Sequence, residues 1–476
     1  MKPLNFTRTK IVCTIGPASD SREMLRQLIL SGMDVARVNQ SHGTHDYHRD
    51  VIRKVRELNQ ELGTHVAILL DLQGPKIRIG PLDSPIPVKP GDVLTFCTAI
   101  KEKQGDLIPV QYQSFGTDVK PGDMVLVDDG KVELTVLETN KIDTVKLRVN
   151  HGDEISSKKG INLPITNISL PSITDKDKAD VAFGVEMDVD WIALSFVRKA
   201  DEIYELRELI TTMGGDARII AKVEKPEALK NIDEIIEAAD AIMVARGDMG
   251  VEIPLEEVPL WQKTIVSKSN AAAKPVIVAT QMMESMITNR RPTRAETSDV
   301  ANAVMDGADA LMLSGETAAG KFPIEVVKSM QRIIQTMEEQ DKIYFRNMGA
   351  SKHSATWLND MINVTATELA QRTDAKALIG FTLSGYTAFW LSKCRPKGFI
   401  HIFTENKKLL TVLSLVWGVR AYYYDRNIST DNTFSDIGQF LKAQKYVRKD
   451  DVVIFTASMP IQARQRTNTI KLELIS

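Results

Sequence analysis

The sequence predicts an α/β protein: a (β/α)8 TIM barrel with an inserted small all-β domain and a C-terminal open α/β domain. Short apolar segments rich in β-branched residues alternate with amphipathic helical stretches, as in parallel sheets whose strands are joined by helices. The starts of these segments lie about 30 residues apart, except for one interval of about 125 residues between Val66 and Trp191. The chain of 476 residues is long enough for roughly three domains.

Eight segments are predicted as barrel strands because each is short and apolar and most are followed by a helical stretch. They are Lys10–Ile15, Val35–Asn39, Val66–Leu72, Trp191–Val197, Ile219–Glu224, Ala241–Arg246, Pro275–Thr280 and Ala310–Ser314. The clearest βαβ unit runs from Ile219 to Gly250, with a helical segment opening after Pro226. We expect the barrel to comprise residues 1–80 and 159–345.

The long interval places an inserted domain at residues 81–158. This region contains short alternating strands without helical spacing, and Asp129 with Gly130 forms a two-residue hairpin signal. A domain attached by two short linkers at the end of the third strand is placed to close over the barrel rim as a lid. The sequence leaves open the alternative that the inserted domain is a passive addition to the barrel and does not act as a lid.

The last region, residues 346–476, again alternates helices and strands after the polar segment NMGASKHS. It ends in a final strand with the sequence TIKLELI. This order predicts an open, doubly wound sheet.

The composition excludes several classes of protein. The 60 basic and 62 acidic residues leave a formal charge of -2, so no basic field indicates nucleic acid or an anionic membrane as a partner. The three cysteines, Cys13, Cys97 and Cys394, are far apart, which argues against a disulfide framework. No apolar run approaches the ~20 residues needed to span a bilayer. We therefore expect a cytoplasmic protein whose partners are small molecules.

Polar or charged residues follow most of the predicted barrel strands, and the fourth strand is the exception. The carboxyl ends of parallel strands share one rim, so these residues are expected to face a common space. They are Arg37, Asn39, Ser41 and His42 after the second strand, Asp71, Gly74, Lys76 and Arg78 after the third, Lys222 and Glu224 after the fifth, Arg246, Gly247 and Asp248 after the sixth, Thr280 after the seventh, and Ser314 and Glu316 after the eighth.

These residue types suit phosphoryl transfer. Glu224 and Asp248 offer hard oxygen ligands for Mg2+ (or Mn2+) and leave other positions to water and substrate. Arg37 and Arg78 suit bidentate recognition of phosphoryl oxygens, and Lys222 adds a point charge. A single charge at a strand end is most often a solvated loop residue, and the repetition over several strands favours a site.

Two further observations qualify this interpretation. The chain has neither a GxxxxGK[ST] loop nor a kinase-type glycine loop, so cations of the rim and lid must hold nucleotide phosphates. His42 has two interpretations, a hydrogen-bonded structural histidine or a functional one.

The motifs at these strand ends closely resemble the pyruvate kinase family. The matching segments are KIVCTIGPAS, VARVNQSHG, DLQGPKIR, AKVEKPEAL, MVARGDMGVEIP, ATQMMESM and DGADALMLSGETAAGKFP. The resemblance covers nearly the whole chain, including an insertion after the third barrel strand and a C-terminal α/β domain. It implies a glycolytic enzyme that transfers the phosphoryl group of phosphoenolpyruvate to ADP, giving pyruvate and ATP. It also implies a Mg2+ cofactor and a homotetramer in which the C-terminal domain regulates the barrel through a phosphorylated allosteric effector.

The resemblance also implies roles for individual residues. Glu224 and Asp248 are expected to bind the divalent metal, and substrate is expected to meet the backbone at Gly247. Lys222 is expected to neutralise charge on the transferring phosphoryl group and on the enolate that remains. Arg37 is expected to bind the phosphoryl group.

Further family positions concern the enolate and the nucleotide. Thr280 is expected to contact the substrate carboxylate and to help a water protonate the enolate, with Ser314 and Glu316 supporting that proton path. The residues expected to bind the nucleotide are Asn39, His42, Arg78 and Lys159. Lys158, next to Lys159 in SKKGINLP, is the alternative for the last position.

One departure from the family concerns K+. Many members hold K+ with groups that match Asn39, Ser41 and Asp71 and carry a glutamate where this chain has Lys76. The ammonium of Lys76 can supply positive charge near the nucleotide site in place of the ion. We therefore hypothesise that activity does not depend on K+, even where K+ binds.

A second departure lies near the C-terminus. Four residues resemble the effector-phosphate loop of the family: Thr382, Ser384, Gly385 and Thr387. Hydroxyls and helix N–H groups suit a phosphate, and a plain strand-to-helix turn is the alternative. The final loop carries Arg464 and Arg466 in place of the glycines of many relatives, so it suits an anion or a neighbouring subunit.

Two rival functions remain open at this stage. The first is a metal-dependent barrel lyase or mutase acting on pyruvate enolates, which needs no ADP. The second is a non-catalytic phosphometabolite sensor. The presence of Lys222, Glu224, Asp248 and Thr280 together disfavours the sensor, because binding alone needs no apparatus for proton transfer.

Overall fold

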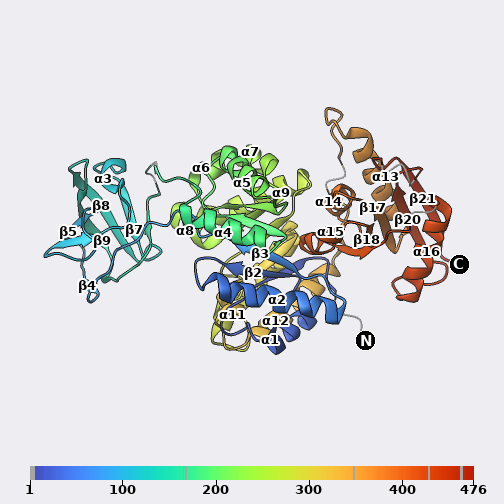
Figure 1. Ribbon diagram of the computed structural model, residues 1–476, viewed down its shortest axis with the longest axis horizontal. Coiled ribbons are helices and arrows are strands. Elements are labelled where there is room, and N and C mark those ends of the chain that lie inside the picture. The colour runs from blue at the N-terminus through green and yellow to red at the C-terminus, as the bar shows by residue number, and fades with distance from the viewer. Residues whose placement is uncertain (1–5, 165, 167–168, 347–348, 427–428, 461–464) are drawn as a thin grey trace.

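The computed structural model describes residues 6–164, 166, 169–346, 349–426, 429–460 and 465–476. A closed barrel forms the middle of the molecule, and the inserted domain and the C-terminal domain lie on opposite sides of it (Figure 1). The fold class predicted from the sequence is therefore confirmed.

The barrel consists of eight parallel strands in the order β1-β16-β15-β14-β13-β12-β3-β2. Each of the eight predicted segments overlaps one of them, and the bounds differ by a few residues at most. The strands are β1 (Lys10–Thr14), β2 (Val35–Asn39), β3 (Ala67–Asp71), β12 (Trp191–Leu194), β13 (Arg218–Val223), β14 (Ala241–Ala245), β15 (Val276–Ala279) and β16 (Ala310–Leu313).

Helices connect the strands, and local sequence signals explain where several of them begin and end. Capping boxes at Thr174 and Thr293 open α4 and α10, and Gly32, Gly63 and Gly307 close α1, α2 and α10 in the left-handed conformation. The helices of the barrel are α1 (Arg22–Ser31), α2 (His45–Leu62), α4 (Asp175–Glu186), α5 (Ala200–Thr212), α6 (Pro226–Lys230), α7 (Ile232–Ala238), α8 (Arg246–Glu252), α9 (Val258–Ala271), α10 (Arg294–Asp306), α11 (Gly315–Ala318) and α12 (Pro323–Glu338).

The central βαβ unit differs from the expectation in two details. The helical stretch after Pro226 is divided at Asn231 into α6 and α7. Arg246, Gly247 and Asp248 do not extend the strand but form the first turn of α8. Asp248 therefore lies at the start of a helix directly after β14.

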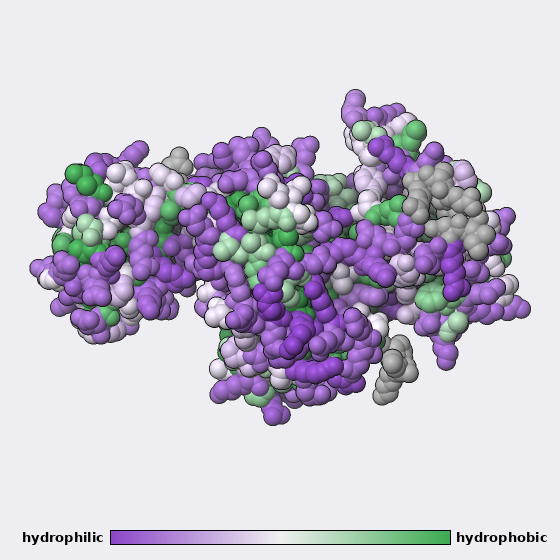
Figure 2. Space-filling view, in the orientation of Figure 1, coloured by the Kyte–Doolittle hydropathy of each residue, from purple (hydrophilic) through white to green (hydrophobic). Residues whose placement is uncertain are grey.

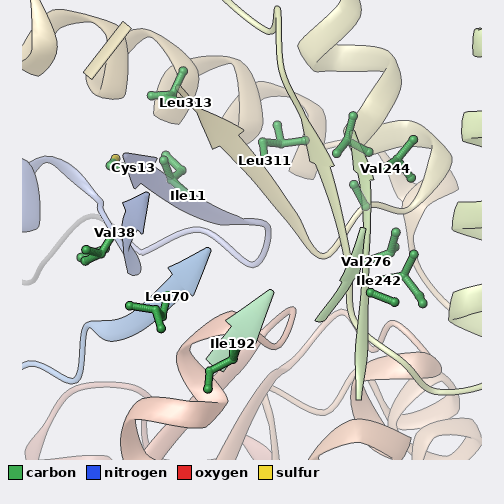
Figure 3. Close-up of a cluster of buried hydrophobic side chains, with 14 of the residues drawn as sticks. Ile11, Cys13, Val38, Leu70, Ile192, Ile242, Val244, Val276, Leu311 and Leu313 are labelled. Carbon is green, nitrogen blue, oxygen red and sulfur yellow. The ribbon is translucent and has the colours of Figure 1, made fainter. Parts of the chain in front are cut away.

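The barrel strands are buried on both faces, as in other parallel barrels. One face packs against the helices, and Figure 3 shows part of this cluster, including Ile11, Leu70 and Ile242. Residues of the opposite face, such as Val12 and Met243, join a second cluster that continues into the C-terminal domain. The barrel is thus a packed core, and its functional groups are at its ends.

The inserted domain leaves the barrel after β3, at the carboxyl end of the strands. Its main sheet has the order β11-β7-β8-β9-β5-β6, and β10 pairs with β4. The strands are β4 (Ile86–Pro87), β5 (Val93–Cys97), β6 (Leu107–Pro109), β7 (Met124–Val127), β8 (Val132–Thr139), β9 (Thr144–His151), β10 (Glu154–Ile155) and β11 (Ile161–Asn162), and one short helix, α3 (Phe115–Asp118), accompanies them.

The predicted hairpin joins β7 and β8, but its loop is longer than two residues. Val127 pairs with Val132, so the loop runs from Asp128 to Lys131. Asp128, Asp129 and Gly130 all have positive φ angles. The carboxylate of Asp128 forms ion pairs with Lys131 and Lys159, which ties this loop to the return linker.

The C-terminal domain is an open sheet with the order β19-β18-β17-β20-β21, in which only β21 is antiparallel to its neighbour. Its elements are α13 (Trp357–Thr373), β17 (Ala377–Phe381), α14 (Tyr386–Lys393), β18 (Phe399–Thr404), α15 (Lys407–Val412), β19 (Val419–Tyr423), α16 (Thr430–Ala443), β20 (Val452–Ala457) and β21 (Thr469–Leu474).

This domain closes the amino-terminal end of the barrel, opposite the inserted domain. Trp191, the first residue of β12, donates from its indole N–H to the carbonyl oxygen of Val412 at 3.3 Å. Arg395 is 2 % exposed and forms an ion pair of 2.9 Å with Asp309, just before β16. The carboxyl end of the barrel remains open towards the inserted domain.

The face in Figure 2 is mostly hydrophilic, with apolar residues gathered over the middle of the barrel. Within the described residues, no helix combines the length and the hydropathy that a bilayer crossing requires.

Candidate active site

Arg37 and Asp71 meet at the carboxyl ends of two neighbouring strands, β2 and β3. The Nε atom of Arg37 donates to Oδ2 of Asp71 at 2.7 Å, and its Nη1 atom donates to Oγ1 of Thr14 at 2.8 Å. Asp71 is 1 % exposed. Burial acts to raise the pKa of Asp71, but the charges of Lys222 and Arg37 outweigh it, so the pKa is lowered and the carboxylate stays ionised.

Lys222 lies between two carboxylates. Its Nζ atom is 3.4 Å from Oδ1 of Asp71 and 3.0 Å from Oε1 of Glu224. Burial acts to lower the pKa of Lys222, but Asp71 and Glu224 outweigh burial and raise it above its ordinary value. The ammonium therefore stays charged in the working range of pH, close to the guanidinium of Arg37.

Glu224 and Asp248 form the candidate metal site. Glu224 is completely buried, and burial raises its pKa to about 7. Its Oε2 atom accepts the N–H of Phe196 at 2.7 Å, while Oε1 faces Lys222 without a full hydrogen bond. The charge of Asp248 also raises the pKa of Glu224, as expected for two carboxylates that face a shared space.

This arrangement fits a hard divalent cation. A buried carboxylate with an elevated pKa and a second carboxylate beside it gain from a bound positive charge. No cluster of three or more potential metal-ligating side chains occurs among the described residues. Glu224 and Asp248 would thus supply two carboxylates and leave further positions to water and substrate, as Mg2+ prefers.

Thr280 and Gly247 contact each other at the ends of β15 and β14. The N–H of Gly247 donates to Oγ1 of Thr280 at 2.7 Å, and this hydroxyl donates to the carbonyl oxygen of Ala279 at 2.6 Å. Thr280 has a φ angle of 67°, which is unfavourable for a β-branched residue and is typical of functional sites. The structure thus brings together two of the residues expected to meet substrate.

The carboxylate of Glu316 connects two loops at the carboxyl end of the barrel. Its Oε1 atom accepts the N–H of Met283 at 3.1 Å, and its Oε2 atom accepts the N–H of Ser314 at 2.7 Å. Glu316 is 2 % exposed, so its carboxylate fastens the loop after β15 to the loop after β16. Ser314 lies in the same loop, directly after β16.

The four residues expected to bind a nucleotide lie on three segments. Oδ1 of Asn39 accepts the N–H of Ser41 at 3.1 Å, and the side chain of His42 is exposed on the same loop. Arg78 donates to the carbonyl oxygen of Lys158 at 3.2 Å. Lys159 forms an ion pair of 2.9 Å with Asp128 of the inserted domain.

The three groups expected to hold K+ lie close together. Asn39 and Ser41 share a turn, and Asn39 stands opposite Asp71 in the register of β2 and β3, where the Asp71 carboxylate also contacts Arg37 and Lys222. Lys76 is exposed, lies beside Gly160, and forms no ion pair with Asp71 or with any other described residue. The expectation that the Lys76 ammonium supplies positive charge near the nucleotide site stays a prediction.

The expected effector loop borders a cavity of about 340 Å3 in the C-terminal domain. Thr382, Ser384 and Thr387 line the cavity together with Arg466. Gly385 precedes α14 with a φ angle of 89°, and its N–H donates to Oγ1 of Thr382 at 2.9 Å. Arg464 lies outside the described residues.

Sequence reasoning missed the contribution of the fourth barrel strand. Ser195 and Phe196 follow β12, and both contact the site: Nζ of Lys222 donates to Oγ of Ser195 at 2.7 Å, and Phe196 supplies the N–H that reaches Glu224. A hydroxyl directly after a buried strand was the available signal. The hydroxyl of Ser195 carries no charge, so the sequence alone does not distinguish this residue from an ordinary loop serine.

The fold and the site together define a class of protein: a (β/α)8-barrel phosphotransferase with a candidate metal site of two carboxylates at the carboxyl end of its strands. Comparison with known proteins gives the family. The model for "pyruvate kinase, barrel domain" matches residues 6–327, and the model for "pyruvate kinase, alpha/beta domain" matches residues 360–473. The chain belongs to the pyruvate kinase family.

Individual relatives agree with this assignment. A pyruvate kinase of Geobacillus stearothermophilus is 43% identical, and the match covers 98% of this chain and 80% of that protein. One of Corynebacterium efficiens is 41% identical over 98% of both chains. The crystal structure of a pyruvate kinase from Cryptosporidium parvum superposes with a TM-score of 0.92 at 35% identity, over 99% of this chain and 96% of that one.

Proposed function

We propose that the protein transfers the phosphoryl group of phosphoenolpyruvate to ADP and releases pyruvate and ATP. The observation that carries this proposal is the position of Lys222, whose ammonium lies between Asp71 and Glu224 on the same rim as Arg37. Two fixed cations next to a metal site are the arrangement that phosphoryl transfer requires, because charge moves between oxygens while little covalent chemistry falls to the protein.

The cations act on the phosphoryl group and on the enolate. Arg37 holds phosphoryl oxygens with the N–H groups that Asp71 and Thr14 do not occupy. Lys222 stabilises the charge that develops on the transferring group and on the enolate oxygen. Glu224 and Asp248 would hold a divalent cation, which would add positive charge beside Arg37 and Lys222.

The geometry around Thr280 supports a role in protonation of the enolate. Its Oγ1 atom is held by the N–H of Gly247, and its proton, donated to Ala279 without substrate, turns to the substrate when the carboxylate binds. We assign Thr280 to the substrate carboxylate and to the water that protonates the enolate carbon. Glu316 supports this step indirectly, because it fixes the loops that carry Met283 and Ser314.

The nucleotide is proposed to bind between the rim and the inserted domain. Asn39, His42 and Arg78 come from the barrel side, and Lys159 comes from the linker that returns from the inserted domain. The ion pair between Lys159 and Asp128 links the proposed nucleotide site to the hairpin loop of the lid. Closure of this domain would exclude water from the transfer.

The remaining proposals follow from the family. We propose a cytoplasmic homotetramer with Mg2+ as cofactor, and a phosphorylated effector bound in the cavity beside Thr382, Ser384 and Thr387. Hydroxyls, the guanidinium of Arg466 and the start of α14 offer the groups that a phosphate needs. K+ binding near Asn39 and Ser41 is proposed to be dispensable.

The test is an assay that follows pyruvate and ATP separately, with phosphoenolpyruvate, Mg2+ and either ADP or no nucleotide. Equal formation of pyruvate and ATP, abolished without ADP, is the expected result. Consumption of phosphoenolpyruvate without ADP would instead favour a lyase or mutase. Binding of phosphoenolpyruvate in a calorimeter without any turnover would favour a sensor.

A further inference from the structure

The turn after β12 contacts Lys222 of β13 and Glu224, the residue directly after that strand. Ser195 accepts a hydrogen bond from Lys222, and the peptide N–H of Phe196 donates to Glu224. We propose that Ser195 is a positioning residue that holds the ammonium of Lys222 at its working position and keeps it from displacing the metal at Glu224. This inference rests on the proposed function and deepens it.

The direction of the hydrogen bonds at Ser195 follows from counting protons. The single hydroxyl proton is donated to the carbonyl oxygen of Leu72 at 2.7 Å. The oxygen is then free only to accept, and it accepts from Nζ of Lys222 at 2.7 Å. Ser195 is 1 % exposed, so water does not compete for either bond.

The ammonium has three protons and three neighbouring acceptors. The hydrogen bond to Ser195 is the shortest of the three contacts, followed by Glu224 at 3.0 Å and Asp71 at 3.4 Å. A neutral oxygen thus anchors Lys222 more closely than either carboxylate does. The loosely held proton near Asp71 remains available for an oxygen of the phosphoryl group.

The turn that carries Ser195 is rigid. Phe196 has a φ angle of 56°, and the Cβ atom of an alanine in place of Gly74 would come within 2.9 Å of the Ser195 side chain. Gly74 is itself held by a hydrogen bond of 3.0 Å from its N–H to Oδ1 of Asp177. The side chain of Ser195 is therefore packed closely against Gly74, and its hydroxyl is tied to the backbone at Leu72, as a positioning group requires.

Loss of this oxygen has a consequence for the metal. A buried ammonium without its nearest acceptor moves towards the remaining ones, Asp71 and Glu224. A closer contact with Glu224 competes with a divalent cation for the same carboxylate. The Ser195→Ala variant should therefore be impaired both in turnover and in metal binding.

The experiment compares Ser195→Ala with Ser269→Ala. Ser269 is a completely buried serine of α9 whose hydroxyl has no hydrogen-bond partner, so it controls for the change in packing. Steady-state kinetics with phosphoenolpyruvate, ADP and Mg2+ is combined with Mn2+ binding, followed by electron paramagnetic resonance without substrates. Circular dichroism and thermal unfolding confirm that both variants are folded.

For Ser195→Ala we expect kcat to fall about 10- to 100-fold, because a buried hydrogen bond to a charged group is lost. The KM for phosphoenolpyruvate should change less than about threefold, since the lost contact acts in the transition state. The Kd for Mn2+ should rise at least about threefold. Ser269→Ala should match the wild-type protein in all three quantities.

A Ser195→Ala protein with kcat or Mn2+ affinity within about twofold of Ser269→Ala would overturn the proposal. If this variant does not fold, Ser195→Cys takes its place, because it keeps a donor for Leu72 and replaces the oxygen by a weak sulfur acceptor. The Ser195→Cys variant should also show a lower kcat and a weaker affinity for Mn2+. If both quantities match those of Ser269→Ala, the proposal is overturned. The Mn2+ measurement does not need turnover, so it tests Ser195 even if the wild-type protein forms no pyruvate.

Discussion

Arg37 donates a hydrogen bond of 2.7 Å from its Nε atom to Oδ2 of Asp71, on the neighbouring strand of the barrel. Asp71 also faces Lys222, so one buried carboxylate is the counter-charge of both cations that we assign to the phosphoryl group. Its replacement by a neutral group leaves two positive charges side by side without their shared counter-charge.

Asp71→Asn is therefore expected to lower kcat at least about tenfold while the protein stays folded. Initial rates with phosphoenolpyruvate and ADP provide the measurement. Asp175→Asn removes a carboxylate whose side chain is 99% exposed, and it should leave kcat unchanged. Equal rates for the two variants would show that Asp71 does not organise the site.

Activity is expected not to depend on K+. The sequence-based reason is the ammonium of Lys76 at the position where K+-dependent relatives carry a glutamate, although the structure places this side chain beside Gly160 and not at Asp71. Rates in K+ and in an equal concentration of tetramethylammonium should agree within about twofold. The Lys76→Glu variant should gain a requirement for K+. A large increase in the wild-type rate on adding K+ would contradict the hypothesis.

Asp190 gives a prediction for stability as a function of pH. It is 4 % exposed and accepts hydrogen bonds from Ile68 and Thr411. Burial raises its pKa from 3.8 to about 6, so between these values the folded protein binds more protons than the unfolded chain. This group therefore lowers stability as pH rises through that window and has a constant effect above it.

Asp190→Asn abolishes this contribution. The variant should gain about 3 kcal/mol relative to the wild-type protein between pH 4 and pH 8. Thermal unfolding of both proteins over this range of pH measures the gain as a change in the difference of their Tm values. A difference that stays constant with pH would mean that Asp190 is not held neutral by burial.

Arg395 anchors the C-terminal domain to the barrel. Its guanidinium forms an ion pair with Asp309 and donates to Asn270 and to the carbonyl oxygen of Gly307 at 2.8 and 2.7 Å. Arg395→Met leaves Asp309 buried without its partner, which costs about 3–5 kcal/mol. We expect Tm to fall by at least about 4 °C.

The control for this prediction is Lys397→Met. Lys397 also forms an ion pair of 2.9 Å, with Asp341, but their side chains are 54% and 84% exposed. Exposed pairs contribute little, so the Tm of this variant should stay close to that of the wild-type protein. Similar losses in both variants would indicate that burial does not determine the contribution of Arg395.

The sequence was sufficient to predict the barrel and the charged residues of its rim. Periodicity located the strands, and Lys222 and Glu224 stand at a strand end, where parallel topology dictates a shared rim. It was not sufficient for contacts that depend on backbone geometry. The N–H of Gly247 bound to Thr280 and the hydroxyl of Ser195 bound to Lys222 involve neutral groups, which no pattern of charge or hydropathy reveals.

The geometry of loops could likewise not be predicted fully from the sequence. The pair Asp129 and Gly130 indicated a hairpin correctly, but the loop includes Asp128 and Lys131 because the carboxylate of Asp128 is drawn to Lys159 from a different segment. The position of Lys76 likewise depends on the return of the chain from the inserted domain, next to Gly160. Such long-range contacts are decided by tertiary structure.

The central claim is that Lys222 stabilises the charge of the transferring phosphoryl group, and the turnover of Lys222→Met tests it most directly. Methionine keeps most of the side-chain volume and removes the charge. With phosphoenolpyruvate, ADP and saturating Mg2+, we expect kcat to fall by several orders of magnitude while Mn2+ binding at Glu224 and Asp248 is retained. A decrease of less than about tenfold would contradict the role assigned to Lys222.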